Sequence, residues 1–140
     1  MADNSVLTIS IVTPDGMVYQ NDQAHLVIVK TKTGELGIMR DHLPVIASLE
    51  VDEARVKYDN GKEDEIAVNG GFVEFSDNVL TIIADSAEKQ GDIDVERAER
   101  ARQRAQQKIQ AAQSKHDNVA ITRGQIALQR AVNRIHVARH

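Results

Sequence analysis

The spacing of apolar residues changes once along this chain, near residue 90, and that change constrains the fold more than any other feature. Before it, apolar and polar residues alternate, as in LTISIVT, where Leu7, Ile9 and Ile11 share one face of a strand. After it, steps of three or four residues predict one face of a helix, made of Val95, Ala98, Ala101, Ala105, Ile109 and Ala112. A strand-rich part is therefore followed by a helical part.

The strand-rich part contains several short β-branched or alternating runs, namely HLVIVK, EARVKY, EIAV, FVEF and NVLTII. Turn signals separate these runs at Asp15-Gly16, Thr33-Gly34, Asn60-Gly61, Gly70-Gly71 and Asp77-Asn78. Asn60-Gly61 is the strongest signal and predicts a two-residue hairpin. Short, evenly spaced strands over roughly residues 4 to 86 indicate a β-sandwich or flattened barrel.

The helical part predicts two antiparallel helices. Asp94 is placed to cap the first helix, and SKHDN is the expected connection. A second apolar stripe follows, formed by Ile121, Leu128, Val132 and Ile135. The stripes are rich in alanine, which buries little area, so we expect the hairpin to need another surface for stability. The predicted fold class is α+β, with a sandwich domain over residues 1–87 and a helical hairpin over residues 88–140.

Charge divides the chain in the same way. Residues 1–91 carry 7 Lys and Arg against 16 Asp and Glu, a balance of −9. Residues 92–140 carry 10 against 5, a balance of +5, which gives the whole chain its net charge of −4. Such a split indicates either two units with different partners or one unit that attracts the other.

Several cations of the helical part have no acidic neighbour within their own helix. Glu96 with Arg100, and Glu99 with Arg102, are spaced for ordinary ion pairs, whereas Arg97, Arg104 and Lys108 are not. No acidic residue follows Asp117, and three further arginines fall on one side of the second helix, at Arg123, Arg130 and Arg134. One interpretation is a solvated basic face. The other is a polyphosphate site, because arginine forks hold phosphate oxygens in pairs.

Other classes of function are disfavoured by what the sequence lacks. It has no cysteine, no glycine-rich phosphate loop, no G-x-S-x-G and no H-E-x-x-H. His136 and His140 are spaced by four residues, which we interpret as incidental, and we expect no metal site. MADNSVLTIS does not have the pattern of a signal peptide, and no apolar run is long enough for membrane insertion. We therefore expect a protein without catalytic residues.

Four segments, in order, resemble the epsilon subunit of bacterial F-type ATP synthases. GELGIMRDHLPVIASL is similar to the family's G-E-[IL]-G-I…H-x-P, and NGGFVEFSDNVLTIIADSAE to its G-G-F-x-E…N-x-V-T-[IV]-[LI]-A-D. IDVERA resembles the I-D-x-x-R-A motif of ATP-binding members, and LQRAVNRIHVA the ending L-x-R-A-x-N-R-L. The resemblance implies a non-catalytic rotor subunit that couples proton-driven rotation to ATP synthesis and inhibits ATP hydrolysis through its hairpin.

The resemblance also implies an ATP site, with ATP bound as a regulatory ligand that is not hydrolysed and without a metal requirement. Its residues would be Glu88, Ile93, Asp94, Arg97, Ala98, Arg104, Arg130 and Arg134. Ile93 and Asp94 would lie by the adenine, and Arg130 and Arg134 would approach the phosphates. Two of these have an alternative interpretation, since Asp94 would be required as a helix cap and Ile93 as a packing residue of the first turn.

The implied partners are the gamma subunit, the ring of c subunits and an acidic surface of the catalytic alpha/beta hexamer. The implied location is the cytoplasmic face of the bacterial cell membrane, as a peripheral part of the complex. The c-ring contact would use the loop with Met39, Arg40, His42 and Pro44. His42 has an equal alternative as a solvated loop histidine.

Two features depart from the family pattern: Gly124, which weakens a helix by about 1 kcal/mol relative to Ala, and a long connection through QSKHDNVA. Both weaken the predicted start of the second helix and any role for Arg123. Three rival functions remain to compare. The acidic first part and the scarcity of aromatic residues disfavour a nucleic-acid binder. The lack of catalytic residues disfavours a hydrolase. A sandwich adaptor that dimerises through its helices would be distinguished by its oligomeric state.

Overall fold

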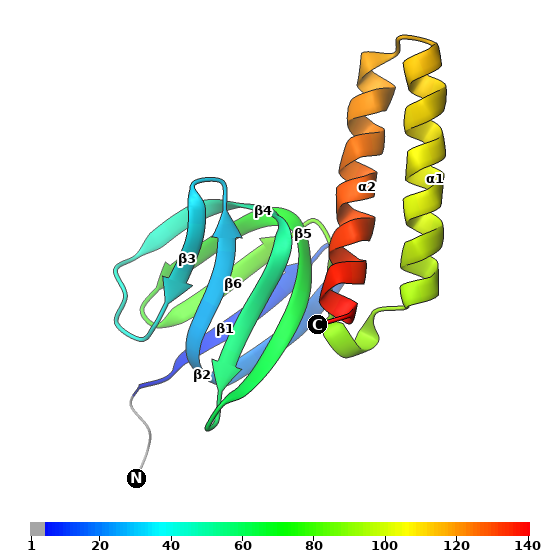
Figure 1. Cartoon of the computed structure of the whole chain (residues 1–140). Helices are drawn as coiled ribbons and strands as arrows, with labels where there is room; N and C mark the ends of the chain where they lie inside the picture. The colour runs from blue at the N-terminus through cyan, green and yellow to red at the C-terminus, as the bar shows by residue number, and fades with distance from the viewer. Residues whose placement is uncertain (1–4) are drawn as a thin grey trace. The chain divides into compact units, whose positions relative to one another are not determined.

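The structure is a computed structural model that describes residues 5–140. The first four residues belong to the expected sandwich domain and to the segment compared with a signal peptide, and they lie outside the described residues. The chain divides into two compact units, one ending at Gln90 and the other spanning Gly91–His140. The first is a β-sandwich and the second a pair of helices, which confirms the predicted fold class (Figure 1).

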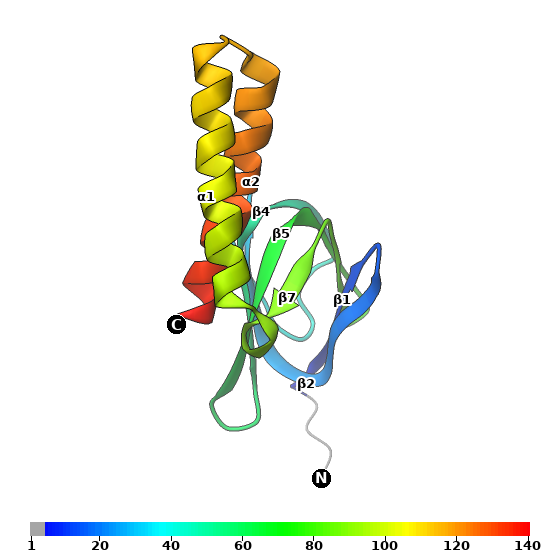
Figure 2. The same cartoon turned by 90° about the vertical axis from the view of Figure 1, so that its right-hand side faces the viewer.

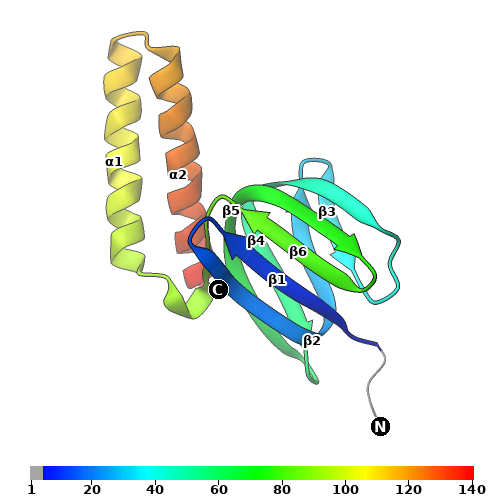
Figure 3. The same cartoon turned by 180° about the vertical axis from the view of Figure 1, so that it is seen from behind.

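The first unit is built from strands that the described residues place at β1 Leu7–Thr13, β2 Gly16–Thr31, β3 Gly34–Ile38, β4 Val45–Tyr58, β5 Lys62–Ser76, β6 Val79–Ala84 and β7 Ala87–Lys89. Hydrogen bonds connect them in the order β1-β6-β5-β4-β2-β3, and β1 also pairs with β2. This last pairing closes five of the strands into a flattened barrel. In Figure 1 the layer that contains β2, β3 and β4 faces the viewer, and in Figure 3 the opposite layer, with β1 and β6, faces the viewer.

Aliphatic side chains fill the space between the layers. Leu7, Ile9 and Ile11 are almost fully buried, which confirms the face predicted from LTISIVT. The buried cluster is mostly Val, Ile, Leu and Ala, and Phe75 and Tyr19 are its aromatic members. Burial of this apolar area is the main stabilising contribution to the sandwich.

The prediction of a turn at Gly70-Gly71 is wrong. EIAV and FVEF are parts of the single strand β5. It pairs with β7 before the two glycines, where Figure 2 shows β7 beside it, and with β6 from Gly71 onward. Both glycines have positive φ, 86° and 127°. A Cβ atom at Gly71 would lie 2.1 Å from the carbonyl oxygen of Ile83. The glycines therefore permit a close approach of β6, and they do not reverse the chain.

The hairpin between β4 and β5 was predicted with two residues and has three. Tyr58 pairs with Lys62, and the loop residues Asp59, Asn60 and Gly61 all have positive φ. The predicted turn at Asp77-Asn78 is confirmed, because Ser76 pairs with Val79 around these two residues. The strands are also longer than the predicted runs, because paired backbone continues through polar residues that break the apolar alternation.

The short helix η1 Gln90–Asp92 spans the boundary between the two units, and the second unit continues with α1 Val95–Ser114 and α2 Asn118–Ala138. The helices run antiparallel and side by side (Figure 1). Each begins at an aspartate whose Oδ1 accepts a backbone N–H 3.1 Å away, Asp94 from Arg97 and Asp117 from Ala120. The connection is shorter than predicted, since only Lys115, His116 and Asp117 separate the helices.

The two helices pack through small residues. Ala98, Ala105 and Ala112 are buried on α1, as the stripe predicts. On α2 the buried positions that continue this contact are Gly124, Ala131 and Ile135, with Ile121 and Leu128 partly buried. Val132 was predicted in the stripe and is 46% exposed, so that assignment is wrong. The fully buried position is Ala131, and because a helix turns by about 100° per residue, Val132 lies at the edge of the contact.

Candidate functional site

A carboxylate is shared between the start of α1 and the end of α2. Glu99 of α1 binds Arg102 of the same helix, with Oε2 and Nη2 2.7 Å apart. Its Oε1 also accepts a hydrogen bond from Nη2 of Arg139, at 3.2 Å, beyond the end of α2. The predicted Glu99–Arg102 pair is confirmed. Arg139 was not singled out from the sequence, because a contact between helices has no signal in either helix alone.

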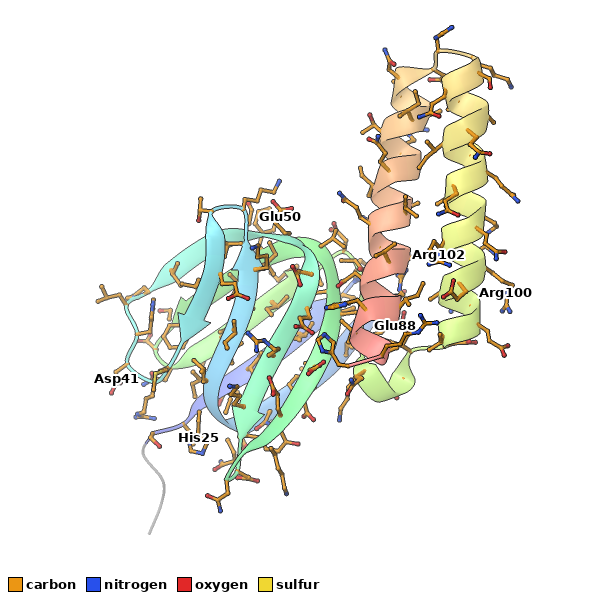
Figure 4. The ribbon with its side chains drawn as sticks, viewed as in Figure 1. His25, Asp41, Glu50, Glu88, Arg100 and Arg102 are labelled. Carbon is orange, nitrogen blue, oxygen red and sulfur yellow. The ribbon has the colours of Figure 1, made fainter. Side chains whose placement is uncertain are left out.

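The register of the two helices brings Arg104 level with the turn of α2 that holds Arg130 and Arg134. Ile109 packs against Gly124 at one level and Glu99 meets Arg139 at another, so the residues between them face each other in reverse order. Figure 4 shows α1 with Arg100 and Arg102 labelled. Residues far apart in sequence are thereby brought to the same height along the hairpin.

The candidate arginines also lie on the same side. Around α1, Arg97 and Arg104 flank the buried alanines on the side opposite Glu99. Around α2, Arg130 and Arg134 flank the buried residues on the side opposite Arg139. Because Glu99 and Arg139 meet on one face of the hairpin, the other face receives the four candidate arginines. We call this surface the arginine face, defined by Arg97, Arg104, Arg130 and Arg134.

The residues at the start of α1 have clear structural roles. Asp94 is the N-cap, so the alternative interpretation of that residue is confirmed, and its second carboxylate oxygen remains available. Ala98 is only 3% exposed and packs between the helices. Ile93 is partly buried, and Arg97 and Arg104 are exposed. Glu88 lies in β7, opposite Ala67 of β5, and so belongs to the first unit (Figure 4).

The loop between β3 and β4 is held firmly against the end of the sandwich. Asp41, labelled in Figure 4, has a φ of 67°, and its backbone N–H donates to Asn78 Oδ1 at 2.7 Å. Asn78 Nδ2 donates back to Asp41 Oδ1 at 3.1 Å. Arg40 donates to the carbonyl oxygen of Val6 at 3.0 Å, so this guanidinium supports the loop as well as being exposed.

The same loop presents apolar side chains. Met39 is 60% exposed and Leu43, which the sequence did not single out, is 79% exposed. His42 is partly buried, its ring nitrogen Nδ1 lies 2.6 Å from the Leu43 carbonyl oxygen, and it meets Phe75 edge-on. His42 is therefore not a simple solvated histidine. Pro44 is exposed and ends the loop before β4.

A polar cluster inside the first unit joins β7 to the barrel. Asp64 accepts hydrogen bonds from the Tyr19 hydroxyl at 2.8 Å and the Tyr58 hydroxyl at 3.2 Å, and Lys89 Nζ lies 4.0 Å from the same carboxylate. Burial raises the pKa of Tyr19 well above its ordinary value, and Asp64 adds to this rise while the hydrogen bond from Asn21 opposes it. No local pattern predicts this cluster, because its members come from separate strands.

Two segments match known families. Residues 6–90 match the family described as "ATP synthase, Delta/Epsilon chain, beta-sandwich domain", and residues 92–139 match "ATP synthase, Delta/Epsilon chain, long alpha-helix domain". The ATP synthase epsilon chain of Pediococcus pentosaceus is 61% identical over 140 residues, and that of Levilactobacillus brevis is 65% identical over 141, with the whole of each chain covered. The chain belongs to the ATP synthase epsilon family. Epsilon chains are non-catalytic subunits of the central stalk.

Solved structures agree with this assignment. A chain in the cryo-EM structure of the Euglena gracilis mitochondrial ATP synthase, described as OSCP/F1/c-ring in rotational state 1, matches with a TM-score of 0.78 at 25% identity. The match covers all of this chain and 85% of that one. A chain in the Tetrahymena thermophila mitochondrial ATP synthase central stalk and c-ring shares the fold, with a TM-score of 0.51 over 61% of this epsilon chain and 68% of that one. Among residues 5–140, no helix is long and apolar enough to cross a membrane.

Proposed function

We propose that this epsilon chain inhibits ATP hydrolysis through its hairpin, in response to ATP, while the sandwich couples proton-driven rotation to ATP synthesis. The observation that supports the regulatory part is the arginine face, on which two helices direct four guanidinium groups to the same side. Several positive charges on one side of a helical pair attract a polyanion such as a nucleoside triphosphate.

ATP has the charge and shape for this face. Its triphosphate carries a charge of about −4, and each close pair of opposite charges contributes about 4 kcal/mol at an effective dielectric near 20, before desolvation. Arg97, Arg104, Arg130 and Arg134 would bind phosphate oxygens in pairs. Ile93 and Asp94 would lie by the adenine, and Asp94 would accept from its amino group with the oxygen not used for capping. Ala98 would support the site from between the helices, and Glu88 would approach the same site. ATP is bound and not hydrolysed, and no metal is required.

Regulation follows from a difference in affinity between two arrangements of the hairpin. In the inhibitory arrangement, the arginines meet an acidic surface of the catalytic alpha/beta hexamer. In the other arrangement they bind ATP. ATP favours the second only by binding it more tightly, and at a hundred times its dissociation constant it shifts the equilibrium by about 2.7 kcal/mol. When the two arrangements of the hairpin are nearly equal in free energy, a shift of this size strongly changes their relative populations.

The sandwich would bind the gamma subunit and rest on the c ring, at the cytoplasmic face of the membrane and without inserting into it. For the c ring we propose the loop containing Met39, Arg40, His42 and Pro44. The exposed side chains of Met39 and Leu43 support this proposal, because they offer apolar contact area on a loop with a fixed backbone.

The test is ATP hydrolysis by the reconstituted complex, measured over a range of ATP concentrations. With the wild-type epsilon chain, rising ATP should relieve inhibition beyond the effect of substrate saturation. Arg130→Ala with Arg134→Ala should remove this relief, whereas Arg102→Ala should preserve it, because Arg102 lies on the Glu99 side. If the double variant matches the wild type and the isolated chain shows no ATP-specific response, the regulatory proposal is rejected and the stalk assignment stands.

A further inference from the structure

The tip of the hairpin contains a groove that the arginine face does not include. It measures about 430 Å³ and lies where α1 ends and α2 begins. It is lined by Lys108 of α1, Lys115 of the connection and Arg123 of α2, which we call its walls, and by Ala112, Ala120 and Ala127, which we call its floor. This volume is within the range of about 300 to 1,000 Å³ that is usual for small-molecule sites.

The three cations in the groove have no partners. Within residues 5–140, no side chain forms an ion pair or hydrogen bond with the side chain of Lys108, Lys115 or Arg123. The acidic residue in the groove is Asp117, and its Oδ1 is engaged in capping α2 through the Ala120 N–H. Three cations against one carboxylate leave an excess of positive charge, which an anionic ligand would balance.

The apolar floor of the groove favours anions that also carry an apolar group. The alanine side chains and the backbone at Gly124 offer a shallow apolar surface between the charged walls. A simple phosphate ion would contact the cations and leave this surface in water. A ligand with a planar aromatic group and a phosphate chain would cover the alanines and reach the cations together.

We propose that this groove is a second binding site for a nucleoside triphosphate, with the base on the alanine floor and the phosphates on Lys108, Lys115 and Arg123. It shares no residue with the arginine face, so it is independent of the proposed function. The site gives a role to Arg123, whose position within α2 was in doubt from the sequence. Gly124 contributes by keeping the helices close, which holds Lys108 and Arg123 on opposite walls of one groove.

The test is titration of the full chain with ATP, followed by the amide NMR signals of Ala120 and Gly124. These signals should move to saturation, and inorganic triphosphate should move them with at least roughly tenfold weaker affinity, because it lacks the base. Lys108→Gln with Arg123→Gln should weaken binding at the tip by roughly tenfold or more. Ala127→Leu should also weaken it, by filling the floor without changing the charge.

The matched control is Arg97→Gln with Arg104→Gln, which removes the same charge from the same face of the hairpin. It should abolish any ATP response at Ile93 and Asp94 and leave the tip signals unchanged. Three results would overturn the second site: no movement of the tip signals at millimolar ATP, loss of that movement in the control variant, or equal affinity for ATP and inorganic triphosphate. Circular dichroism of each variant confirms that the helices are intact.

Discussion

Ile109 of α1 packs directly against the backbone of α2 at Gly124, where a Cβ atom would lie 2.6 Å from Ile109 Cγ1. This contact explains a residue that helix propensity disfavours. Gly124 weakens α2 as an isolated helix, and in the hairpin it allows the branched side chain opposite it to approach.

We therefore expect Gly124→Ala to destabilise the hairpin, although alanine is the better helix former by about 1 kcal/mol. Overpacking against Ile109 should cost about 1 to 3 kcal/mol, so the net change is a loss of helical stability. Thermal unfolding followed by circular dichroism measures it. In the background Ile109→Ala the same substitution should become stabilising, and a loss that persists there would contradict the packing explanation.

Glu99→Gln should loosen the end of the hairpin where the two helices share that carboxylate. Since Arg139 is largely exposed, the loss should be no more than about 1 kcal/mol and should diminish at high salt. Amide hydrogen exchange should accelerate in the last turn of α2. Glu96→Gln removes the same charge from the first turn of α1, and an equal effect of that variant on α2 would show that the cross-helix contact is unimportant.

Gly71→Ala should disrupt the sandwich severely. The added methyl group would overlap the carbonyl oxygen of Ile83, at 2.1 Å, and the φ of 127° disfavours a side chain. A loss of about 3 kcal/mol or more is expected in urea unfolding. Gly61→Ala is the matched control, because its φ is 95° and no atom lies within 4 Å, so it should cost only about 1 kcal/mol.

The stability of the sandwich should fall at high pH because of Tyr19. Its pKa is raised in the folded state, so the unfolded chain loses this proton near pH 10 while the folded chain retains it. The contribution of the raised Tyr19 pKa to the free energy of unfolding is fully present below about pH 10, and it declines as the pH rises further. Urea unfolding over this range should show a steep decline.

Tyr19→Phe removes that titration and should flatten the dependence on pH. It should also lower stability near neutral pH, because Asp64 loses a hydrogen-bond donor. A smaller slope should remain, since burial and Asp64 also raise the pKa of Tyr58. An unchanged slope in Tyr19→Phe would show that Tyr19 does not control the alkaline limit.

Much of the candidate site could be predicted from the sequence because helices are local structures. The spacing of Ala98, Ala105 and Ala112 identified the buried face of α1, and Asp94 was recognised as a cap. The same spacing shows which arginines flank each stripe. It does not show whether the two flanks lie on the same face of the hairpin, because that depends on how the buried stripes of the two helices pack against each other.

The sequence by itself determined the change from strands to helices, the core face of the first strand and the cap of the first helix, since each depends on neighbours within a few residues. Tertiary structure decided the closure of β1 onto β2, the continuous path of β5 through Gly70 and Gly71, and the close packing at Gly124. A glycine in a sequence permits either a turn or a close approach. Which of the two occurs depends on what packs against the glycine. The backbone of β6 packs against Gly71, and the side chain of Ile109 packs against Gly124, so both are close approaches.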